Sequence, residues 1–250
     1  MDSPLVVVLV EPTGPINVGS VARLCANFAV SELRLVAPRC DPHAEDAVKM
    51  AVHGKNLLTQ ASIHPSLLDA VQDCRRTIAT CGRLDHGEIP LHSPEVGLTW
   101  LNTPPLDRTL SQSPIAVVFG REDRGLTNDE LRLCQRVVTL YSDPTYPSLN
   151  LSHAVAVILH ELKRLQATDH NKGHVAEVVA DPAPAADMQG FLEDAQDLLL
   201  EIGFLLEHTV SARMAKLQNL LQRASARREE VALLRGMIRQ VRWAIRTHRT

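Results

Sequence analysis

Short apolar runs alternate along this chain with longer stretches in which apolar residues recur at helical spacing. The runs predict five strands, at Leu5–Val10, Leu33–Ala37, Thr77–Cys81, Ile115–Phe119 and Val137–Tyr141. An uninterrupted apolar run such as Leu5–Val10 is typical of a strand that is buried on both faces of a sheet. The alternation therefore predicts an α/β fold, in which helices cover both faces of a parallel sheet.

The stretches between these runs predict five helices, at Asn17–Phe28, Asp46–Leu58, Ser66–Cys74, Thr127–Cys134 and Leu151–Gln166. Thr127 followed by Glu130 fits a capping box at the start of the fourth helix. The segment Leu84–Gln112 is rich in proline, so we expect an irregular excursion on the surface there.

The chain changes character near residue 165. Residues 166–187 hold few large apolar side chains and include the proline-rich segment Asp181–Asp187, which is typical of a linker. Three helical patterns follow, at Met188–Glu207, Ser211–Arg223 and Glu229–Arg246. We therefore expect a first domain at residues 1–165, a linker at 166–187 and a small helical domain at 188–250.

The helical tail is basic, although the whole chain has a formal net charge of -3. Residues 211–250 hold 10 Lys/Arg and 2 Asp/Glu, whereas residues 1–210 hold 16 and 27. The last helical pattern carries a stripe of five arginines, at positions 228, 235, 239, 242 and 246. Like charges at such spacing repel each other, and no acidic residue interleaves with them. The stripe therefore predicts a polyanionic partner, and a solvated helical face is the alternative interpretation.

Composition limits the class of protein. None of the five cysteines belongs to a Cys-x-x-Cys pair, so we expect neither structural zinc nor a disulfide framework, and a reducing cytoplasm is the natural compartment. No apolar run approaches the roughly 20 residues of a membrane-spanning helix. The first apolar run follows Asp2 rather than a basic segment, so we expect no signal peptide.

Several familiar motifs are incomplete in this chain. Gly14 and Gly19 have the spacing of a P-loop, but Ser20 stands where that motif requires lysine. No Gly-x-Gly-x-x-Gly follows the first strand, which argues against a dinucleotide site and against an ordinary Rossmann-type methyltransferase. His160-Glu161 does not complete His-Glu-x-x-His, because position 164 is arginine, and we expect no metal site.

Three polar segments lie where predicted strands end or helices begin. They are Asn17–Arg23, Gly120–Glu122 and Pro147–Asn150. Each has an ordinary structural explanation when taken alone: a surface ion pair, a strand-to-helix turn and a helix N-cap. Because ligands bind at the carboxyl edge of open α/β sheets, the three segments together predict one binding site.

The residues in these segments resemble a known family. Asn17-x-Gly-Ser-x-Ala-Arg23, Phe119-Gly-Arg-Glu-x-x-Gly-Leu126 and Ser148-Leu-Asn-Leu-Ser-x-Ala154 are similar to the three motifs of the SpoU branch of the SPOUT RNA methyltransferases. The resemblance implies a SPOUT fold with a C-terminal trefoil knot, S-adenosylmethionine bound in that knot, and a homodimer. The strand pattern alone predicts an unknotted sheet, because knots are rare.

The resemblance also implies roles for individual residues. The cofactor is expected to contact four segments, namely Thr80, Cys81 and Gly82, then Gly120, then Leu140, then Pro147, Ser148, Leu149 and Asn150. The catalytic residues implied are Arg23, nearest the reacting hydroxyl, with Asn17, Glu122 and Ser148 close by. Relatives have Thr-Ser-Ala where this chain has Thr80-Cys81-Gly82, and often have glycine at the position of Ile16.

The tail is similar to the helical extension of the family members that modify tRNA, at Gly203-Phe204, Leu217–Ala224 and Leu233–Gly236. This implies 2′-O-methylation of cytidine or uridine at position 32 in the tRNA anticodon loop. Arg235, Arg239 and Arg242 are then the expected RNA contacts, with neither DNA nor a membrane as a partner. The alternatives are the same chemistry on another RNA, or a dimeric RNA-binding module without catalysis.

Arg23 is the residue whose chemistry most needs explanation. An arginine pKa of roughly 12.5–13.8 makes it a poor base at neutral pH. Our hypothesis is that Arg23 orients a phosphate beside the target nucleotide and stabilises the developing alkoxide. This scheme requires no metal.

Overall fold

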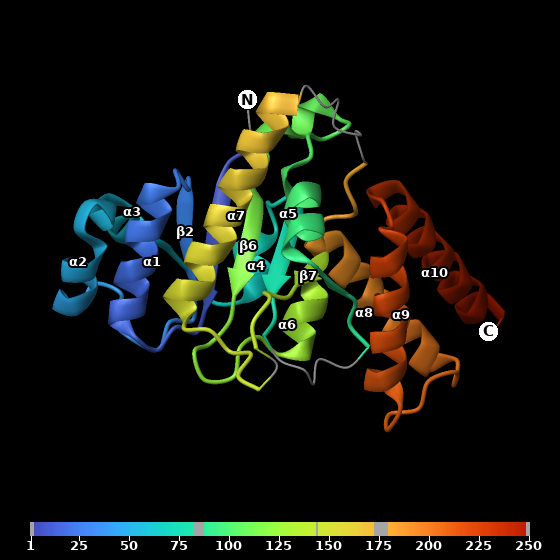
Figure 1. Cartoon of the computed structure of the whole chain (residues 1–250). Coiled ribbons are helices and arrows are strands. Elements are labelled where there is room, and N and C mark those ends of the chain that lie inside the picture. Colours follow the sequence, from blue (N-terminus) through green and yellow to red (C-terminus); the bar gives the residue numbers. More distant parts are fainter. Residues whose placement is uncertain (1–2, 83–87, 144, 173–179, 249–250) are drawn as a thin grey trace. The chain divides into compact units, whose positions relative to one another are not determined.

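The computed structural model describes residues 3–82, 88–143, 145–172 and 180–248. The chain forms two compact units, Met1–Ala180 and Asp181–Thr250. Figure 1 shows the first as a sheet with covering helices and the second as a group of three helices. No helix in the described ranges is long and apolar enough to cross a membrane.

The first unit is built on a seven-stranded sheet with the order β3-β2-β1-β6-β4-β7-β5. Its strands are β1 (Leu5–Val10), β2 (Glu32–Val36), β3 (Ser62–His64), β4 (Arg76–Thr80), β5 (Leu91–His92), β6 (Ile115–Phe119) and β7 (Arg136–Val138). Every neighbouring pair is parallel. The predicted parallel α/β sheet is confirmed.

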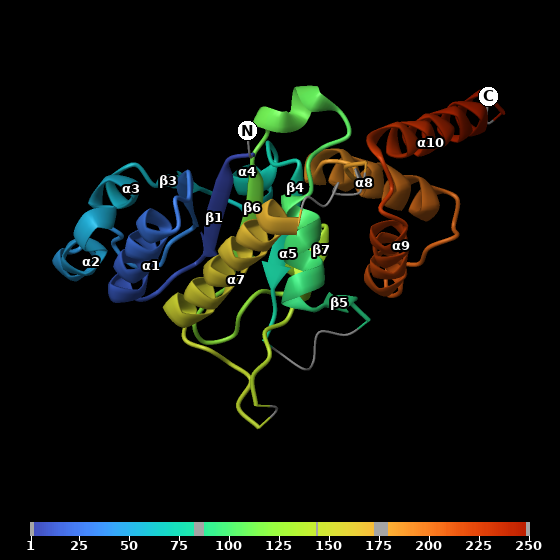
Figure 2. The same ribbon diagram turned by 45° about the horizontal axis from the view of Figure 1, so that its top comes forward.

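Helices cover both faces of this sheet. They are α1 (Pro15–Asn27), α2 (Glu45–Ala51), α3 (Lys55–Thr59), α4 (Leu67–Val71), α5 (Pro94–Asn102), α6 (Asn128–Leu133) and α7 (Leu151–Lys172), with 3-10 turns η1 (Val52–Gly54) and η2 (Arg108–Gln112). Figures 1 and 2 show α1, α7 and α5 side by side on one face, where Val7 and Leu9 of β1 join their core. Val6 and Val8 are equally buried on the other face, as expected for a continuous apolar strand.

The sequence missed three elements of this unit. The edge strands β3 and β5 have only three and two residues, too short for an alternation to register. Helix α5 lies inside the segment expected to be irregular, Leu84–Gln112, of which residues 84–87 lie outside the described ranges. Pro94 stands at the start of α5 behind the Ser93 N-cap, so it begins a helix rather than interrupting one.

The predicted helix Asp46–Leu58 is divided. Val52 adopts φ 47 at the end of α2, and η1 connects α2 to α3. Gly54 lies against α1, where a Cβ on it would be 2.3 Å from the carbonyl oxygen of Ala22. Close packing on α1 therefore explains the interruption that helical periodicity did not predict.

The second unit contains α8 (Ala185–Glu201), α9 (Val210–Ala224) and α10 (Arg228–His248). Its core joins all three helices, through residues such as Phe191, Leu221 and Val231. The three predicted tail helices are confirmed to within a few residues, except that α8 ends earlier than the expected Glu207. The expected linker at 166–187 is partly helical, since α7 continues to Lys172 and α8 begins at Ala185, while residues 173–179 lie outside the described ranges.

Ion pairs between α8 and α10 change the interpretation of the arginine stripe. Three of its members pair with α8 acids at the same seven-residue spacing: Arg228 with Asp187, Arg235 with Asp194, and Arg242 near Glu201, at 2.7, 2.8 and 3.9 Å. The acidic partners come from another helix, so a search along the stripe itself could not reveal them. The argument that only a polyanion relieves the stripe therefore fails for these three arginines.

Candidate active site at the carboxyl edge of the sheet

The carboxyl ends of four neighbouring strands define the candidate site. Because β1, β6, β4 and β7 are adjacent and parallel, the loops that follow them gather at one edge of the sheet. Figure 1 shows these loops below the arrowheads, beside the start of α7. All the segments that the sequence assigned to the cofactor and to catalysis belong to these loops or to the helices that follow them.

Glu122 is the centre of the hydrogen bonding here. Its carboxylate accepts hydrogen bonds from the backbone N–H of Thr13 at 3.0 Å and of Gly14 at 3.1 Å, and from the Thr13 hydroxyl at 3.1 Å. It also accepts one from Nδ2 of Asn17 at 3.2 Å. Burial alone raises the pKa of Glu122, but the hydrogen bonds outweigh it and hold that pKa below its ordinary value. Glu122 is therefore an ionised acceptor at neutral pH that ties the loop after β6 to the start of α1.

Asn17 and Asn150 extend this cluster to the third segment. Nδ2 of Asn150 donates to Oδ1 of Asn17 at 3.2 Å. Oδ1 of Asn150 accepts from the backbone N–H of Ser152 at 2.9 Å and so caps α7. The N-cap role is real, yet the same side chain also joins the cluster. Asn17 is thus hydrogen-bonded to both Glu122 and Asn150, 105 and 133 positions away, and the three predicted segments meet at this edge.

Arg121 is a residue whose role the sequence did not predict. Its buried guanidinium lies between two carboxylates, pairing with Glu130 at 2.8 Å and more closely with Glu11. It also donates to the carbonyl of Gly125 at 3.3 Å. The Glu130 and Glu11 hydrogen bonds raise the pKa of Arg121 above its ordinary value, and the Arg121 hydrogen bond lowers the pKa of Glu11. Arg121 therefore fixes the loop that carries Glu122, and its partners 110 and 9 residues away gave no local signal.

Two glycines allow close backbone approaches at or beside the site. A Cβ on Gly120 would lie 2.3 Å from the backbone nitrogen of Leu126, so the loop can fold back on β6 only with glycine there. Gly19 lies inside α1, which begins at Pro15, so it does not serve a turn. Its role is helix packing, because a Cβ there would lie 2.1 Å from the carbonyl oxygen of Ala47.

Arg23 and Ser148 stand apart from this cluster. Both side chains are exposed, and neither makes a hydrogen bond or ion pair with any residue that the structure describes. Asn17 and Arg23 are six positions apart on α1, about 240° around the helix and about 9 Å along it. One chain therefore brings together Asn17, Glu122 and Asn150 but does not bring Arg23 to them.

The expected cofactor segments are in contact with one another. A Cβ on Gly82 would lie 3.3 Å from the carbonyl oxygen of Pro147, so the end of β4 touches the segment before α7. The hydroxyl of Thr80 donates to the carbonyl of Val118 at 3.1 Å, and Cys81 is buried. Since both side chains are directed into the protein, a ligand at this strand end meets backbone groups, and Cys81 in place of serine leaves those groups unchanged.

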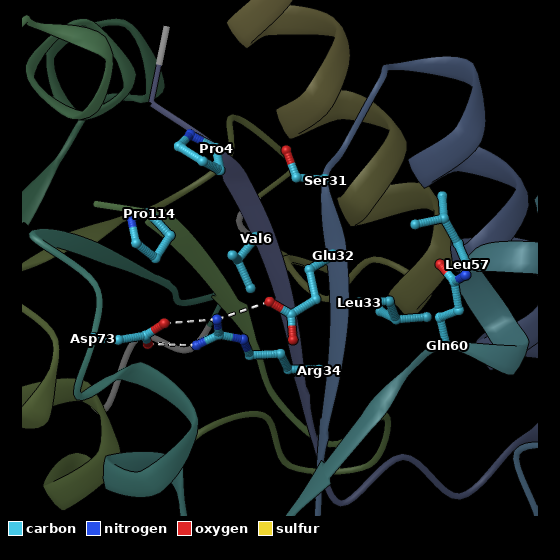
Figure 3. A pocket seen from close by; sticks show the side chains of 10 residues that line it. All are labelled: Pro4, Val6, Ser31, Glu32, Leu33, Arg34, Leu57, Gln60, Asp73 and Pro114. Atoms are coloured by element: carbon cyan, nitrogen blue, oxygen red, sulfur yellow. Dashed lines mark hydrogen bonds and ion pairs between the residues drawn. The ribbon is translucent and has the colours of Figure 1, made fainter. Parts of the chain in front are cut away.

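A cavity of about 430 Å³ lies at the opposite edge, against the amino ends of β1 and β2. Figure 3 shows Arg34 on its wall between Glu32 and Asp73, paired with them at 2.8 and 2.6 Å. The hydrogen bonds that Arg34 donates to the carboxylate of Asp73 raise the pKa of Arg34 and lower the pKa of Asp73, which is typical of a structural ion pair. None of the motif residues lines this cavity, so we place the site at the carboxyl edge.

Comparison with known proteins decides the family. Residues 4–160 match the SpoU rRNA Methylase family. The chain belongs to this family. Residues 186–250 match the C-terminal domain of the tRNA methyltransferase TrmJ. The chain is 32% identical over 237 residues to the tRNA (cytidine/uridine-2'-O-)-methyltransferase TrmJ of Salmonella typhimurium, covering 94% of this chain and 95% of that one.

Solved structures agree with this assignment. The crystal structure of TrmJ from Z. mobilis matches with a TM-score of 0.77 at 27% identity. The match covers 96% of the present chain and 99% of the Z. mobilis chain. The SpoU methyltransferase AviRb of Streptomyces viridochromogenes, solved with AdoMet, matches with a TM-score of 0.51 at 22% identity, over 67% and 60% of the two chains. At that identity the second match shows the fold alone. The SPOUT methyltransferase fold with a helical extension is thus established, and the knot stays a prediction.

Proposed function

We propose that this chain transfers a methyl group from S-adenosylmethionine to the 2′-oxygen of cytidine or uridine at position 32 in the tRNA anticodon loop. The observation that carries the proposal is the hydrogen-bonded cluster of Asn17, Glu122 and Asn150. It unites the three motif segments at one sheet edge in a member of a methylase family. The name of the Salmonella relative supports the substrate class, cytidine or uridine in tRNA.

The residues at this edge fit an adenosine-containing cofactor. Strand-end backbone at Thr80–Gly82 and Gly120 supplies polar groups, and Leu140 and Leu149 are partly exposed apolar side chains next to them. Adenosine sites typically combine apolar walls with a few fixed polar groups. When bound, S-adenosylmethionine supplies an electrophilic sulfonium methyl. We propose that the residues from Pro147 to Asn150 hold it with those strand ends.

The proposed reaction forms a bond between the ribose oxygen and the methyl carbon, breaks the carbon–sulfur bond, and releases the hydroxyl proton. Since the methyl is already activated, positioning of the hydroxyl supplies most of the acceleration. Glu122 and Asn17 hold these segments in place, because their side-chain hydrogen bonds join the loop after β6 and the start of α7 to the start of α1. The exposed Ser148 hydroxyl is available to the substrate, and Arg23 orients the phosphate and stabilises the alkoxide.

We include a homodimer in the proposal because one chain separates Arg23 from the cluster. A second copy is the simplest source of an arginine at the site. Mixing Arg23→Ala subunits with Glu122→Ala subunits, each strongly impaired on its own, tests this. A turnover of the mixture well above that of either variant alone supports an arginine supplied by the partner. A mixture that stays as impaired as the variants, although the two co-assemble, places both residues in the same chain's site.

Arg23 itself is tested by two substitutions. Arg23→Lys and Arg23→Ala are expected to keep S-adenosylmethionine binding and to lose most turnover, because lysine cannot reproduce the planar contact of a guanidinium with a phosphate. Calorimetry for the cofactor and single-turnover methyl transfer are the measurements. Turnover that survives Arg23→Ala overturns the proposed role.

The function as a whole is tested by methyl transfer from labelled S-adenosylmethionine to unmodified tRNA, with the labelled nucleotide identified by digestion. Label on the 2′-oxygen at position 32 supports the proposal and decides between cytidine and uridine. Label elsewhere in tRNA corrects the position, and label only on another RNA corrects the substrate. Failure to bind the cofactor leaves the non-catalytic RNA-binding module as the better explanation. An enzyme of this kind works where tRNA is, so the cytoplasm remains the expected compartment.

A further inference from the structure

Helix α9 carries positive charge that nothing in the described chain neutralises. Residues 208–228 hold five Lys/Arg and no Asp/Glu. Lys216 and Arg223 are exposed and make no ion pair with any described residue. The neighbouring helix α8 is acidic, but three of its five acids, Asp187, Asp194 and Glu201, lie beside the arginines of α10, and no ion pair among the described residues joins Glu193 or Asp197 to α9.

The basic residues of α9 share one face. At 100° per residue, Arg213, Lys216 and Arg223 fall within a sector of about 80°, spread over about 15 Å of helix. Met214, Leu217 and Leu221 lie on the adjoining sector, about 40–100° from Arg213, and pack into the core of the unit. The exposed positions in or within about 20° of the basic sector are these three cations with Ala212, Leu220 and Ala224, so every charged side chain on the outer face of α9 is basic.

Helix stability does not explain this basic face. Arg213 and Lys216 are like charges at i, i+3, which destabilise a helix by a few tenths of a kcal/mol. Arg213 lies near the helix N-terminus, where the backbone dipole disfavours a cation, and that first turn contains no acidic residue. Arg223 in the last turn is favoured by the dipole, so it alone has an intramolecular explanation.

Arg213 is held in place by its surroundings. Its guanidinium donates to the carbonyl of Phe204 at 2.9 Å and lies 5.7 Å from the centre of the Phe204 ring. These contacts orient the side chain and leave its charge unneutralised. An ordered cation beside two unpaired ones suits the evenly spaced charges of a nucleic-acid backbone.

We propose that the outer face of α9 binds the phosphate backbone of tRNA through Arg213, Lys216 and Arg223. This inference rests on the proposed function, which supplies tRNA as the substrate. It adds α9, a helix that the arginine stripe did not indicate, to the RNA contacts expected on α10, where Arg235 and Arg242 are already occupied by α8. Phosphate contacts by these residues fix orientation and carry no base specificity.

The test is the salt dependence of tRNA binding by the full chain. Lys216→Gln with Arg223→Gln removes two unpaired charges and leaves Arg213 with its Phe204 contacts. Each lost phosphate contact lowers the slope of log binding constant against log salt concentration by roughly 1, so the double variant is expected to lose roughly 2. The matched control is Lys55→Gln with Lys163→Gln, an equal charge change on exposed positions of α3 and α7 that make no ion pair with a described residue. Its slope is expected to stay at the wild-type value.

A charge-retaining variant separates contact from fold. Lys216→Arg with Arg223→Lys is expected to keep the wild-type slope, and hydrogen exchange in α9 verifies that each variant is folded. Equal slopes for the Gln double variant and the wild type overturn the inference while tRNA methylation by the wild type stands. If the wild type itself neither binds nor methylates tRNA, the proposed function fails instead, so the two failures are distinguishable.

Discussion

The carboxyl edge of the sheet and the outer face of α9 both gather polar side chains, but in opposite states. At the sheet edge, Asn17 is hydrogen-bonded to Glu122 and to Asn150, 105 and 133 positions away in the sequence. On α9, Lys216 and Arg223 have no partner among the described residues. Polar groups that are hydrogen-bonded to each other hold loops in fixed positions. Unpaired charges on a surface are available to a binding partner.

This difference predicts two kinds of mutational effect. Removing a member of the bonded network leaves partners unsatisfied, several of them partly buried, so the loss is larger and depends less on salt. Removing an unpaired surface charge weakens binding in a graded, salt-dependent way. The predictions below test that division from the largest expected effect to the smallest.

Arg121→Met is expected to have the largest effect. It leaves the carboxylates of Glu11 and Glu130 without their buried partner, and breaking a pair of this kind costs about 3–5 kcal/mol. Urea unfolding followed by Trp100 fluorescence, in a Trp243→Phe background, reports on the first unit. Arg124→Met, an exposed residue 3.8 Å from Glu11, is the control and is expected to change stability by under about 0.5 kcal/mol. Similar losses for the two variants contradict the network.

Glu122→Ala is expected to lower kcat/KM for methyl transfer by about 100-fold, because a small misplacement of positioning groups has an effect of this order. The cause is the loss of the link between the loop after β6 and the start of α1. Asp123→Asn, on the exposed neighbouring position, is expected to retain wild-type turnover. Wild-type kcat/KM in Glu122→Ala contradicts the positioning role.

Within α10, one arginine is ion-paired and another has no ion pair with a described residue, so different effects are expected. Arg235→Gln breaks the pair with Asp194 and is expected to destabilise the helical unit by about 1 kcal/mol, measured by hydrogen exchange in α8 and α10. Arg239 is exposed and has no ion pair with a described residue. Arg239→Gln is expected to leave exchange unchanged and to lower the salt slope of tRNA binding by roughly 1. The opposite result, in which Arg239→Gln destabilises the helical unit and Arg235→Gln only lowers the salt slope, overturns this distinction.

Acid is expected to act on the bonded network first. The pKa values of Glu11, Glu122 and Glu130 lie below their ordinary values, so each contributes stability that is present above the unfolded pKa of roughly 4.3. That stability is lost as pH falls through the folded pKa values. Urea midpoints of the first unit are expected to hold between pH 7 and 5 and to fall below about pH 4. Arg121→Met should show a smaller acid loss, since Glu11 and Glu130 have already lost their partner.

The sequence by itself determined the parallel α/β plan, the three tail helices and the three polar segments that meet at the carboxyl edge of the sheet. An apolar run such as Ile115–Phe119 indicates a buried strand directly. Motif residues such as Asn17 and Asn150 are recognised from the few residues on either side of each. It also located the capping box of Thr127, because a cap depends on neighbours three positions away.

Only the tertiary structure decided which charges are free. Arg235 and Lys216 are both basic residues in helical patterns, and the sequence does not distinguish them. They differ because Arg235 forms an ion pair with Asp194, which lies 41 positions away on another helix. Arg121 is a second example, because its partner Glu11 lies 110 positions earlier in the sequence. Gly19 is a third, because it packs against Ala47 of another helix. Periodicity reports which face of an element is buried, but the groups that meet across that face are chosen by packing.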